Sequence, residues 1–462
     1  MRLAEIAAVV GGEVDGRADV EVAAPAFVDS RQVVEGGLFV AVAGERVDGH
    51  DYAVAAVEAG AAAVLGTRPT GVPTVVVPDP VAALGRLARH VLDALDGVTV
   101  LALTGSQGKT GTKDYLAQVL GAVAPTVATA GNLNNEIGVP LTVLRATPET
   151  SYLLVEMGAR GIGHIAYLCE VARPLVAAVL NVGTAHVGEF GGQDAIARAK
   201  GEIVEALPPE GTAVLNADDP RTAAMGERTV ARSLTFGEHG DVRWRGLELD
   251  SLQRPTFELG YAGRWRTVRL GQAGLHQVSN AAAAAAMALS VGVTLDVVAH
   301  ALTDSVPASR WRMELHERPD GVVVVNDAYN ANPASMAAAI GTVARIGRAR
   351  RGRSLAVLGV MLELGDGAEA DHLEVGRVAA GAGVDVVVTV GEEAAAIAAG
   401  ARGVPTWRGE AIVTASREEA LRWVMENVSA PDVVLVKASR GAALELLADA
   451  LIAQPPEEGD AR

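Results

Sequence analysis

The sequence has little cysteine and no long uninterrupted apolar run. Cys169 is the only cysteine, so no intrachain disulfide can form, and a reducing compartment such as the cytosol is expected. No uncharged apolar run reaches the roughly 18 residues that a membrane span requires. The first residues, MRLAEIAAVVGGEVDG, carry acidic side chains within their apolar stretch, so a signal peptide is not expected. These absences predict a soluble, cytoplasmic protein with no membrane partner.

Basic residues are also scarce relative to acidic ones. The chain has 39 Lys and Arg against 56 Asp and Glu, a formal net charge of −17 at pH 7. No basic excess is available to neutralise a phosphate backbone, so nucleic acid and anionic membranes are disfavoured as partners. Small anions are still acceptable ligands, because a single lysine, a Mg²⁺ ion or a helix N-terminus can hold them.

What is present is a long chain with ample material for cores. Half of the 462 residues are hydrophobic and only 3% are aromatic, which is a globular composition for two to four domains. Short apolar runs alternate with helical stretches such as residues 81–95, and most runs are continuous, as in parallel strands buried on both faces. The runs predicted as strands are residues 37–44, 62–67, 74–78, 98–105, 151–158, 175–183, 212–219, 322–329, 354–360, 384–391 and 432–439.

Two breaks in this α/β pattern predict three domains. A turn at residues 96–97 precedes a fresh strand, and a polar, Arg-rich segment fills residues 305–320. The predicted domains are residues 1–97, 98–312 and 313–462, each of ordinary domain size. Within residues 229–272, the pieces TVARSLTF, FELGYAG and WRTVRL predict an antiparallel addition to the middle domain.

The stretch VTVLALTGSQGKTGTKD, residues 98–114, has the form of a phosphate-binding loop between a strand and a helix. It departs from G-x-x-x-x-G-K-[ST], because Leu103 stands where the first glycine belongs. Backbone N–H groups of such a turn point at an anion, and the helix dipole favours it. Lys109 would then contact the β- and γ-phosphates, and the Thr110 hydroxyl would ligate Mg²⁺. A glycine turn without any ligand is the alternative.

The shortened form T-G-[ST]-x-G-K-[ST] resembles the Mur ligases and the related folylpolyglutamate synthetases, which are three-domain, ATP-dependent, amide-forming enzymes. The resemblance implies an ATP site at Gly105, Ser106, Gln107, Gly108, Lys109, Thr110 and Gly111. It also implies an N-terminal domain that binds a UDP-sugar, a central ATP-binding P-loop domain and a Rossmann-like C-terminal domain.

The family's metal site matches three further stretches of this sequence. LVEMGAR places Glu156 where the family has a magnesium-binding glutamate, and NVGTAHVGEFGG places His186 at the metal-site histidine. ARAKGEI offers Lys200, where the family carries a lysine carbamylated by CO₂. The resemblance thus implies Lys109, His186 and Lys200 as catalytic residues. Taken singly, the three metal-site residues could be a helix cap, a satisfied polar residue and a solvated surface lysine.

Other motifs imply contacts to the nucleotide. GLHQVSNAAAAAAMAL has the family's form, with Asn280 opening a helix near the adenine; a helix N-cap is the alternative role. SRWRME implies Arg310 as a phosphate contact. NDAYNANPASMAAAI, with Asp327, Tyr329 and Asn330, implies an adenine or ribose site, while a structural turn accounts for Asn332 and Pro333.

The D-x-Y-N-A-N-P-x-S-M form of that last motif resembles the branch of the family that adds D-alanyl-D-alanine to UDP-N-acetylmuramoyl-tripeptide. Three further segments imply substrate contacts: residues 29–52 for the UDP-sugar, residues 129–144 for the active site and residues 434–445 for substrate carboxylates. The implied residues are Ser30, Arg31, Asp48, His50, Asn134, Asn135, Glu136, Lys437, Ser439 and Arg440. In LGVMLELGDGAEADH, Val360 stands where relatives usually carry an acidic residue.

The resemblance therefore implies an ATP- and Mg²⁺-dependent ligase acting through an acyl phosphate, with CO₂ as a carbamate on Lys200; a monomer is expected. A sister ligase that adds another amino acid or glutamate keeps the same ATP chemistry. A non-catalytic nucleotide-binding protein is a different class of function. It would predict loss of Lys109, Glu156, His186 or Lys200, and all four are present. The third residue of the tripeptide, diaminopimelate or lysine, stays open.

Overall fold

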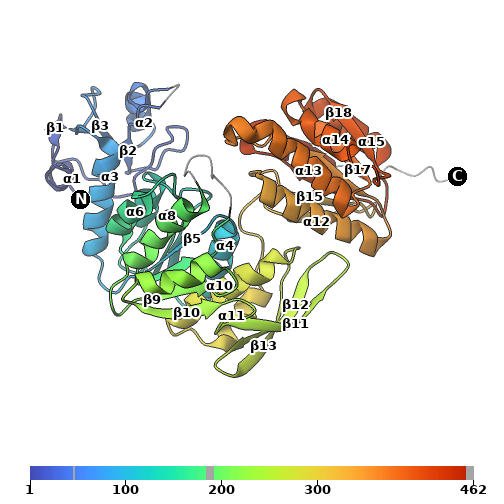
Figure 1. Cartoon of the computed structure of the whole chain (residues 1–462). Helices are drawn as coiled ribbons and strands as arrows, with labels where there is room; N and C mark the ends of the chain where they lie inside the picture. The colour runs from blue at the N-terminus through green and yellow to red at the C-terminus, as the bar shows by residue number, and fades with distance from the viewer. Residues whose placement is uncertain (45–46, 184–191, 454–462) are drawn as a thin grey trace.

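The computed structural model describes residues 1–44, 47–183 and 192–453. Three α/β units follow one another along the chain, and each large sheet draws all its strands from one of them (Figure 1). The predicted three-domain α/β architecture is therefore confirmed, while the boundaries at residues 97 and 312 stay predictions. No helix in the described part of the chain is long and apolar enough to cross a membrane.

The N-terminal unit is built on a four-stranded sheet of order β1-β4-β3-β2. Its strands are β1 (Glu13–Asp15), β2 (Leu38–Val40), β3 (Ala63–Gly66) and β4 (Thr74–Val76), and its helices are α1 (Leu3–Val10), α2 (Ala53–Glu58) and α3 (Pro80–Asp93). Only the β1–β4 pair is antiparallel. Helix α3 begins sharply because Asp79 accepts hydrogen bonds from the first-turn amides and Pro80 occupies the first turn.

The central unit contains a six-stranded parallel sheet of order β10-β9-β8-β5-β7-β6. Its strands are β5 (Thr99–Thr104), β6 (Thr126–Ala128), β7 (Tyr152–Glu156), β8 (Val176–Val179), β9 (Thr212–Asn216) and β10 (Arg232–Phe236). Its helices are α4 (Lys109–Gly121), α5 (Gly138–Val143), α6 (His164–Ala172), α8 (Gln193–Glu205), α9 (Pro220–Ala223), α10 (His276–Ser290) and α11 (Leu295–Thr303).

This sheet is covered on both faces, which explains its continuous apolar strands. Along β5, Leu101 and Leu103 belong to the core shared with α4 and α10, and Val100 and Ala102 belong to the core shared with α6 and α8. Residues 281–286 are six fully buried alanines, and their helix, α10, packs along α4. The short side chains let the two helices approach closely.

The prediction for residues 229–272 is partly wrong. TVARSLTF forms β10, which pairs in parallel with β9 at the edge of the central sheet rather than joining an antiparallel addition. Phe236 is buried in the central core, so burial of this side chain holds the strand there. The antiparallel sheet consists instead of β11 (Arg243–Leu249), which was not predicted, together with β12 (Pro255–Tyr261) and β13 (Arg264–Arg269).

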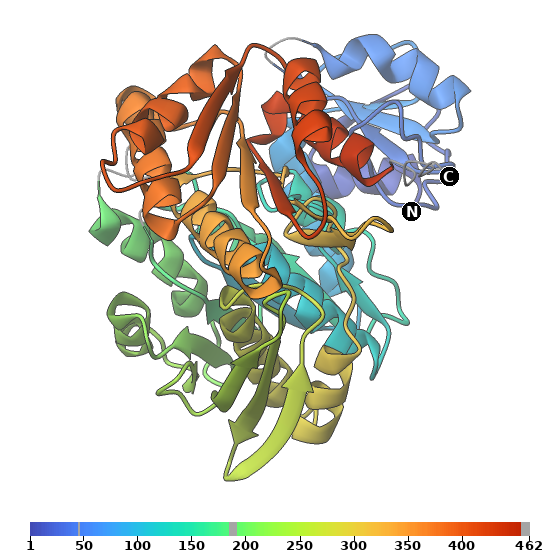
Figure 2. The same cartoon turned by 90° about the vertical axis from the view of Figure 1, so that its right-hand side faces the viewer.

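The C-terminal unit is a doubly wound sheet of order β14-β15-β19-β16-β17-β18, parallel except for β14. Figure 2 shows this unit, in orange and red, in a second view. Its strands are β14 (Glu314–Glu317), β15 (Val323–Asn326), β16 (Ser354–Leu358), β17 (Val386–Val390), β18 (Glu410–Thr414) and β19 (Val433–Lys437). Helices α12 (Pro333–Arg350), α13 (Ala368–Ala382) and α14 (Ala395–Arg402) cover one face, and α15 (Arg417–Asn427) and α16 (Glu445–Ile452) cover the other.

Candidate active site

A pocket of about 540 Å³ lies where the carboxyl ends of central strands β5 and β7 face those of β15 and β19. Ligands bind at this end of the strands in open parallel sheets. Of the residues predicted for a site, the pocket lining contains Gly105, Ser106, Gln107, Gly108, Lys109, Thr110, Gly111, Asn134, Asn135, Glu136, Glu156, Lys200, Asn280, Asp327, Tyr329, Asn330 and Lys437. The fold thus gathers residues from positions more than 300 apart in the chain.

The phosphate loop forms one side of this pocket. Gly108 has φ +79° and precedes the first residue of α4, and a side chain there would collide with Asn280. Lys109 Nζ donates to the carbonyl oxygen of Gly105 at 2.8 Å, which curls the lysine back over the loop. Burial lowers the pKa of Lys109, the Glu156 carboxylate opposes that shift, and the Arg312 guanidinium adds to it.

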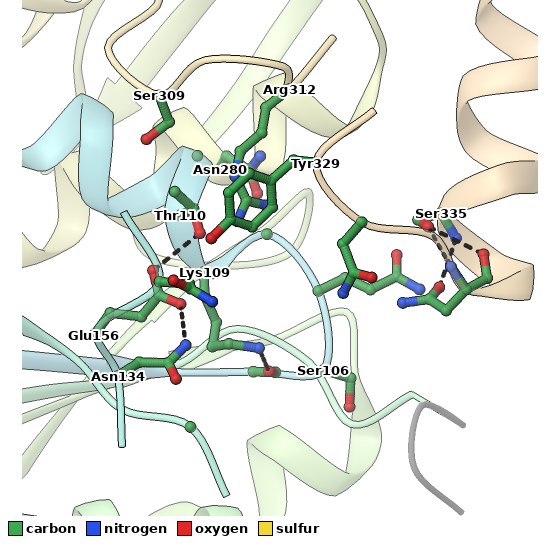
Figure 3. Close-up of a pocket in the computed structure, with 18 of the residues that line it drawn as sticks. Ser106, Lys109, Thr110, Asn134, Glu156, Asn280, Ser309, Arg312, Tyr329 and Ser335 are labelled. Carbon is green, nitrogen blue, oxygen red and sulfur yellow. Dashed lines mark hydrogen bonds between the residues drawn. The ribbon is translucent and has the colours of Figure 1, made fainter. Parts of the chain in front are cut away.

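Beside the loop, two polar side chains donate hydrogen bonds to Glu156. The Thr110 hydroxyl donates to Glu156 Oε2 at 3.0 Å, and Asn134 Nδ2 donates to Glu156 Oε1 at 2.8 Å (Figure 3). Glu156 ends β7 and is only 1% exposed. A buried carboxylate next to a hydroxyl is a donor set of the hard oxygen type that suits Mg²⁺. Within the described ranges no cluster of three His, Cys, Asp or Glu side chains could hold a metal ion, so these two oxygens would need phosphate oxygens or water to complete a site.

Lys200 is not a surface lysine. It lies on α8, lines the pocket and is 6% exposed. Burial, followed by repulsion from Lys109, brings the pKa of Lys200 well below its ordinary value, so the amine is readily neutral. The predicted metal-site histidine, His186, lies outside the described residues.

Asn280 does not open its helix. Helix α10 begins at His276, so Asn280 lies in the second turn, and the N-cap role proposed for it is wrong. Gly274, with φ +113°, lets the chain turn into the helix earlier than the capping preference of asparagine suggested. The Asn280 side chain accepts from the Thr112 hydroxyl at 3.5 Å and donates to Gln277 at 3.2 Å, and it lies against the glycines of the loop.

On the far side of the pocket, an ion pair holds the turn after β15. Lys437 Nζ donates to Asp327 Oδ2 at 2.7 Å and to the carbonyl oxygen of Asn330 at 2.8 Å. Lys437 is 2% exposed, so its charge is committed to this turn. Asn332 caps α12 with Pro333 in the first turn, which confirms the predicted structural turn.

Three of the predicted residues near the linker and β19 have other neighbours. Arg310 stacks on Trp311, with its Cζ 5.1 Å from the ring centroid, and lies 3.8 Å from Asp449; it is not part of the pocket lining. Arg440 stacks on the same ring and pairs with Glu445. Ser439 accepts from the amide of Leu362 at 3.0 Å. Arg310, Ser439 and Arg440 as ligand contacts therefore stay predictions.

Among the lining residues that were not predicted from the sequence, Arg312 and His276 carry charge or titrate. Arg312 lies over the Tyr329 ring, with its Cζ 4.0 Å from the centroid, and lines the pocket where Arg310 does not. The two arginines are two residues apart in SRWRME, and only the backbone conformation decides between them. His276 also lines the pocket; burial lowers its pKa, and its place in the G-x-H form was a usable signal.

Two of the residues predicted for the UDP-sugar, Asp48 and His50, form a hydrogen-bonded cluster in the N-terminal unit, outside the pocket lining. His50 Nδ1 lies 2.5 Å from Asp48 Oδ1, and His50 Nε2 accepts from the Thr67 amide at 2.8 Å. Because Nε2 accepts, Nδ1 carries the proton that is donated to Asp48. Arg68 also donates to Asp48 at 2.8 Å.

Ser30 and Arg31 are the other two residues predicted for the UDP-sugar. The Arg31 guanidinium donates two hydrogen bonds of 2.8 Å to the Asp29 carboxylate, and these bonds lower the pKa of Asp29 to about 2. Neither Ser30 nor Arg31 lines the pocket. Substrate binding by this N-terminal group stays a prediction.

The fold and the site define a nucleotide-binding protein in which a phosphate loop on one α/β unit faces a second, Rossmann-like unit across a polar pocket. Models of three domains match the chain: "Mur ligase family, catalytic domain" at residues 27–91, "Mur ligase middle domain" at residues 103–288 and "Mur ligase, glutamate ligase domain" at residues 311–440. The chain belongs to the Mur ligase family.

Named relatives resemble this chain along nearly its whole length. The UDP-N-acetylmuramoyl-tripeptide–D-alanyl-D-alanine ligase of Mycobacterium tuberculosis (strain ATCC 25618 / H37Rv) is 45% identical, with 98% of each chain covered. The ligase of the same name from Escherichia coli (strain K12) is 37% identical, covering 97% of this chain and 98% of the other.

Solved structures are similar in three dimensions as well. MurF from Acinetobacter baumannii superposes with a TM-score of 0.87 at 34% identity, covering 98% of this chain and 99% of that one. MurF ligase from Thermotoga maritima, in complex with ADP, superposes with a TM-score of 0.79 at 31% identity, covering 93% and 97%.

Proposed function

We propose that this chain joins D-alanyl-D-alanine to UDP-N-acetylmuramoyl-tripeptide, converting ATP to ADP and phosphate. The observation that carries the proposal is the single pocket in which the phosphate loop and Glu156 face Asp327 and Lys437 of the C-terminal unit. Relatives that bear this activity in their names match both units and the N-terminal one. The reaction is one step of peptide addition to a peptidoglycan precursor.

The chemistry requires activation, because an ammonium and a carboxylate do not condense unaided at neutral pH. The terminal carboxylate of the tripeptide attacks the γ-phosphorus, forming an acyl phosphate and releasing ADP. The amine of D-alanyl-D-alanine then attacks the acyl carbon, and phosphate leaves as the amine loses its proton. A pocket between two units suits this sequence, because closing it excludes water that would hydrolyse the acyl phosphate.

The residues of the loop bind and orient the polyphosphate in this proposal. The amides at the start of α4 and the Lys109 ammonium face the phosphates, as the helix dipole favours. Thr110 and Glu156 would hold Mg²⁺, and their bonded oxygens 3.0 Å apart fit that role. When bound, Mg²⁺ neutralises charge that builds up on the phosphate oxygens. Asn280 and Tyr329 would border the adenine and ribose.

We also infer that Lys200 is carbamylated. Only a neutral amine reacts with CO₂, and burial makes the Lys200 amine readily neutral. The carbamate is an anion, so carbamylation would replace a second buried cation beside Lys109 with a pair of oxygens that can bind a metal ion. Protein equilibrated with ¹³C-bicarbonate is expected to show a carbamate signal in ¹³C NMR that is absent in Lys200→Met. The same absence in the wild-type protein would contradict the carbamate.

Further features belong to the same proposal. The N-terminal unit, with Ser30, Arg31, Asp48 and His50, would hold the UDP-sugar, and Asn134, Asn135 and Glu136 would approach the peptide. The boundaries at residues 97 and 312 would separate folding units, which limited proteolysis can test. Both substrates and ATP are cytoplasmic molecules, so a cytoplasmic location is proposed, and cell fractionation is the test. A monomer is proposed as well, and sedimentation velocity is its test.

The proposal is tested by phosphate release from ATP and Mg²⁺ with each acceptor and amine, singly and together. Release is expected only when UDP-N-acetylmuramoyl-tripeptide and D-alanyl-D-alanine are both present. It should be lost in Lys109→Ala and kept in Arg243→Gln, which changes an exposed residue of β11. Release with a different amino acid would assign the chain to a sister ligase, and no release with any pair would contradict an enzyme.

A further inference from the structure

A turn of the central unit reaches into the core of the C-terminal unit. It joins β11 to β12, and Figure 1 shows it beneath α12; residues 250–254 are called the anchor turn below. Leu252 of this turn is 3% exposed and lies in the core that α12, α13 and α14 form against the C-terminal sheet. Every other buried residue described for that core comes from residues 313–435. One side chain of the central unit thus completes the core of its neighbour.

The next residue, Gln253, forms hydrogen bonds in two directions. Its side-chain Oε1 accepts from Arg345 Nε of α12 at 2.9 Å, and its carbonyl oxygen accepts from the amide of Gly274 at 2.9 Å. Gly274 leads into α10, which carries Asn280 beside the phosphate loop, and the start of α12 lines the facing wall of the pocket. The anchor turn therefore connects the two helices that border the pocket from the two units.

Arg345 depends on this contact for its hydrogen bonding. Its side chain is half-buried, and burial, followed by repulsion from Arg348, lowers the pKa of Arg345. Among the described residues its side chain bonds Gln253 and, at 3.4 Å, the Thr342 hydroxyl of its own helix, and no carboxylate pairs with it. A partly buried guanidinium that loses an acceptor pays a desolvation cost. The bond to Gln253 thus opposes sliding of α12 over the turn.

The anchor turn is rigid by itself. Asp250 Oδ1 accepts from the amides of Leu252 and Arg254, both at 2.9 Å, and Arg254 Nε donates to Asp250 Oδ2 at 2.7 Å. Gln253 has φ +60°, a value that side-chain-bearing residues rarely adopt. Such a conformation persists where the surroundings over-determine it. The turn therefore presents Leu252 and Gln253 to α12 in one fixed arrangement.

We propose, on the basis of the ligase function above, that Leu252 and Gln253 are positioning residues: they fix α12 against the start of α10, and the C-terminal unit rotates about this point when the pocket closes. Neither residue lines the pocket, so both act through their neighbours. Fixing α12 sets where its first turn and Asp327 stand relative to the phosphate loop. A misplacement of about 1 Å between reacting groups can cost about 100-fold in rate.

Replacing Gln253 tests the anchor without opening a cavity in the core. Gln253→Gly removes the bond to Arg345, and glycine adopts a positive φ freely, so the turn is expected to keep its shape. The kcat of phosphate release with both acceptor substrates should fall about 10- to 100-fold, because the C-terminal unit no longer meets the phosphate loop in one place. Affinity for a non-hydrolysable ATP analogue should stay close to the wild-type value, since the loop belongs to the central unit. Gln253→Glu keeps an acceptor for Arg345 and should restore most of the rate.

Distances between spin labels report the position of the C-terminal unit directly. Val297→Cys on α11 and Glu426→Cys on α15 place labels at exposed positions of the central and C-terminal units of the full chain. Cys169 is buried, and burial raises its pKa to about 12, so it does not compete for the label. Pulsed dipolar spectroscopy should give a narrow distance distribution that shifts when the ATP analogue and UDP-N-acetylmuramoyl-tripeptide are added.

The anchor variants should broaden that distribution with and without ligands. Leu252→Ala and Gln253→Gly are both expected to do so, and Leu247→Ala, at an exposed position of β11, is the matched control that should change neither distribution nor rate. If Leu252→Ala does not fold, Gln253→Gly decides. A distribution in Gln253→Gly as narrow as that of wild type would overturn the pivot, and a broadened distribution with the wild-type kcat would overturn the positioning role.

The two measurements also separate this inference from the proposed function. Broadening in the anchor variants of a protein that joins no substrates would leave the pivot standing and remove the ligase assignment. Ligation by wild type and Gln253→Gly at equal rates, with equal distance distributions, would remove the inference alone.

Discussion

Individual side chains in this protein hold charges at defined places inside a polar pocket. Glu156 is the clearest case: it is buried, it ends β7, and both of its oxygens accept hydrogen bonds, from Thr110 and Asn134. A buried carboxylate with two such neighbours is oriented before any ligand arrives. Its position therefore does not depend on substrate binding.

Replacing Glu156 by Gln keeps the shape and removes the charge. The rate of ATP-dependent phosphate release is expected to fall about 100-fold or more, because the anionic oxygen that would hold Mg²⁺ is lost. The Mg²⁺ concentration needed for half-maximal rate should rise, which a Mg²⁺ titration of the rate measures. Glu248→Gln, at an exposed position on β11, is the control. An unchanged Mg²⁺ requirement in Glu156→Gln would contradict the metal-site assignment.

A second prediction concerns Asp48 and acid stability. The His50 amide, then the His50 ring and the Arg68 guanidinium, hold the pKa of Asp48 below its ordinary value of 3.8. A carboxyl with a lowered folded-state pKa contributes stability above its ordinary pKa, and this contribution is lost as the pH falls through the folded-state value. Asp48→Asn should therefore lower the melting temperature near pH 7, and the difference from wild type should shrink below about pH 4.

Thermal unfolding of the two proteins at several pH values measures this difference. Asp51→Asn is the matched control, since Asp51 contacts the same Arg68 at 3.2 Å without bonding His50. A difference between wild type and Asp48→Asn that stays constant or grows on acidification would show that the Asp48 charge does not stabilise this cluster.

At the scale of elements, the contact between α4 and α10 sets the shape of the phosphate loop. Gly108 and Gly111 leave room for Asn280, and the alanines of residues 281–286 let α10 lie close to α4. Small residues on both helices thus allow the side-chain carboxamide of Asn280 to lie against the phosphate loop. A larger side chain at this contact has no space to occupy.

Ala284→Leu is expected to lower the free energy of unfolding by about 1–3 kcal/mol, the usual cost of overpacking a dense core. It should also weaken nucleotide binding, because α10 must move away from α4. Chemical denaturation and nucleotide calorimetry measure the two effects. Ala55→Leu, at an exposed position of α2, is the control and should change neither. Normal stability in Ala284→Leu would mean that the α4–α10 contact is looser than described.

At the scale of the whole molecule, the linker with Arg312 joins the C-terminal unit to the central one, and the turn between β11 and β12 also contacts the C-terminal unit. In that turn Leu252 is buried within the C-terminal core, and Gln253 accepts from Arg345 Nε of α12 at 2.9 Å. These contacts limit how the C-terminal unit can move relative to the central unit.

Closure of the C-terminal unit over the central one is expected when both substrates are present, because an acyl phosphate must be kept from water. Small-angle scattering should show a smaller radius of gyration with an ATP analogue and UDP-N-acetylmuramoyl-tripeptide than with either alone. Lys109→Ala, which should not hold the analogue, is the control and should show no change. The same radius in all states of the wild-type protein would contradict closure.

Much of this architecture could be predicted from the sequence, because short continuous apolar runs bounded by turn residues are typical of strands buried on both faces. The predicted strands at residues 98–105 and 151–158 became β5 and β7, and the loop chemistry at Lys109 follows from the strand, turn and helix around it. The edge of the sheet was harder to predict, because Phe236 is the one fully buried residue of β10 and the rest of the strand is exposed or half-buried.

The sequence by itself determined most strands of the parallel sheets, the phosphate loop and the resemblance to a ligase family, because these depend on local patterns. Only the tertiary structure decided that Lys200 is buried, that Asn280 lies inside α10, and that Arg312 enters the pocket in place of Arg310. The physical reason is that burial and side-chain direction depend on contacts between segments far apart in the chain. A local pattern states which residues are available, and packing determines which of them meet.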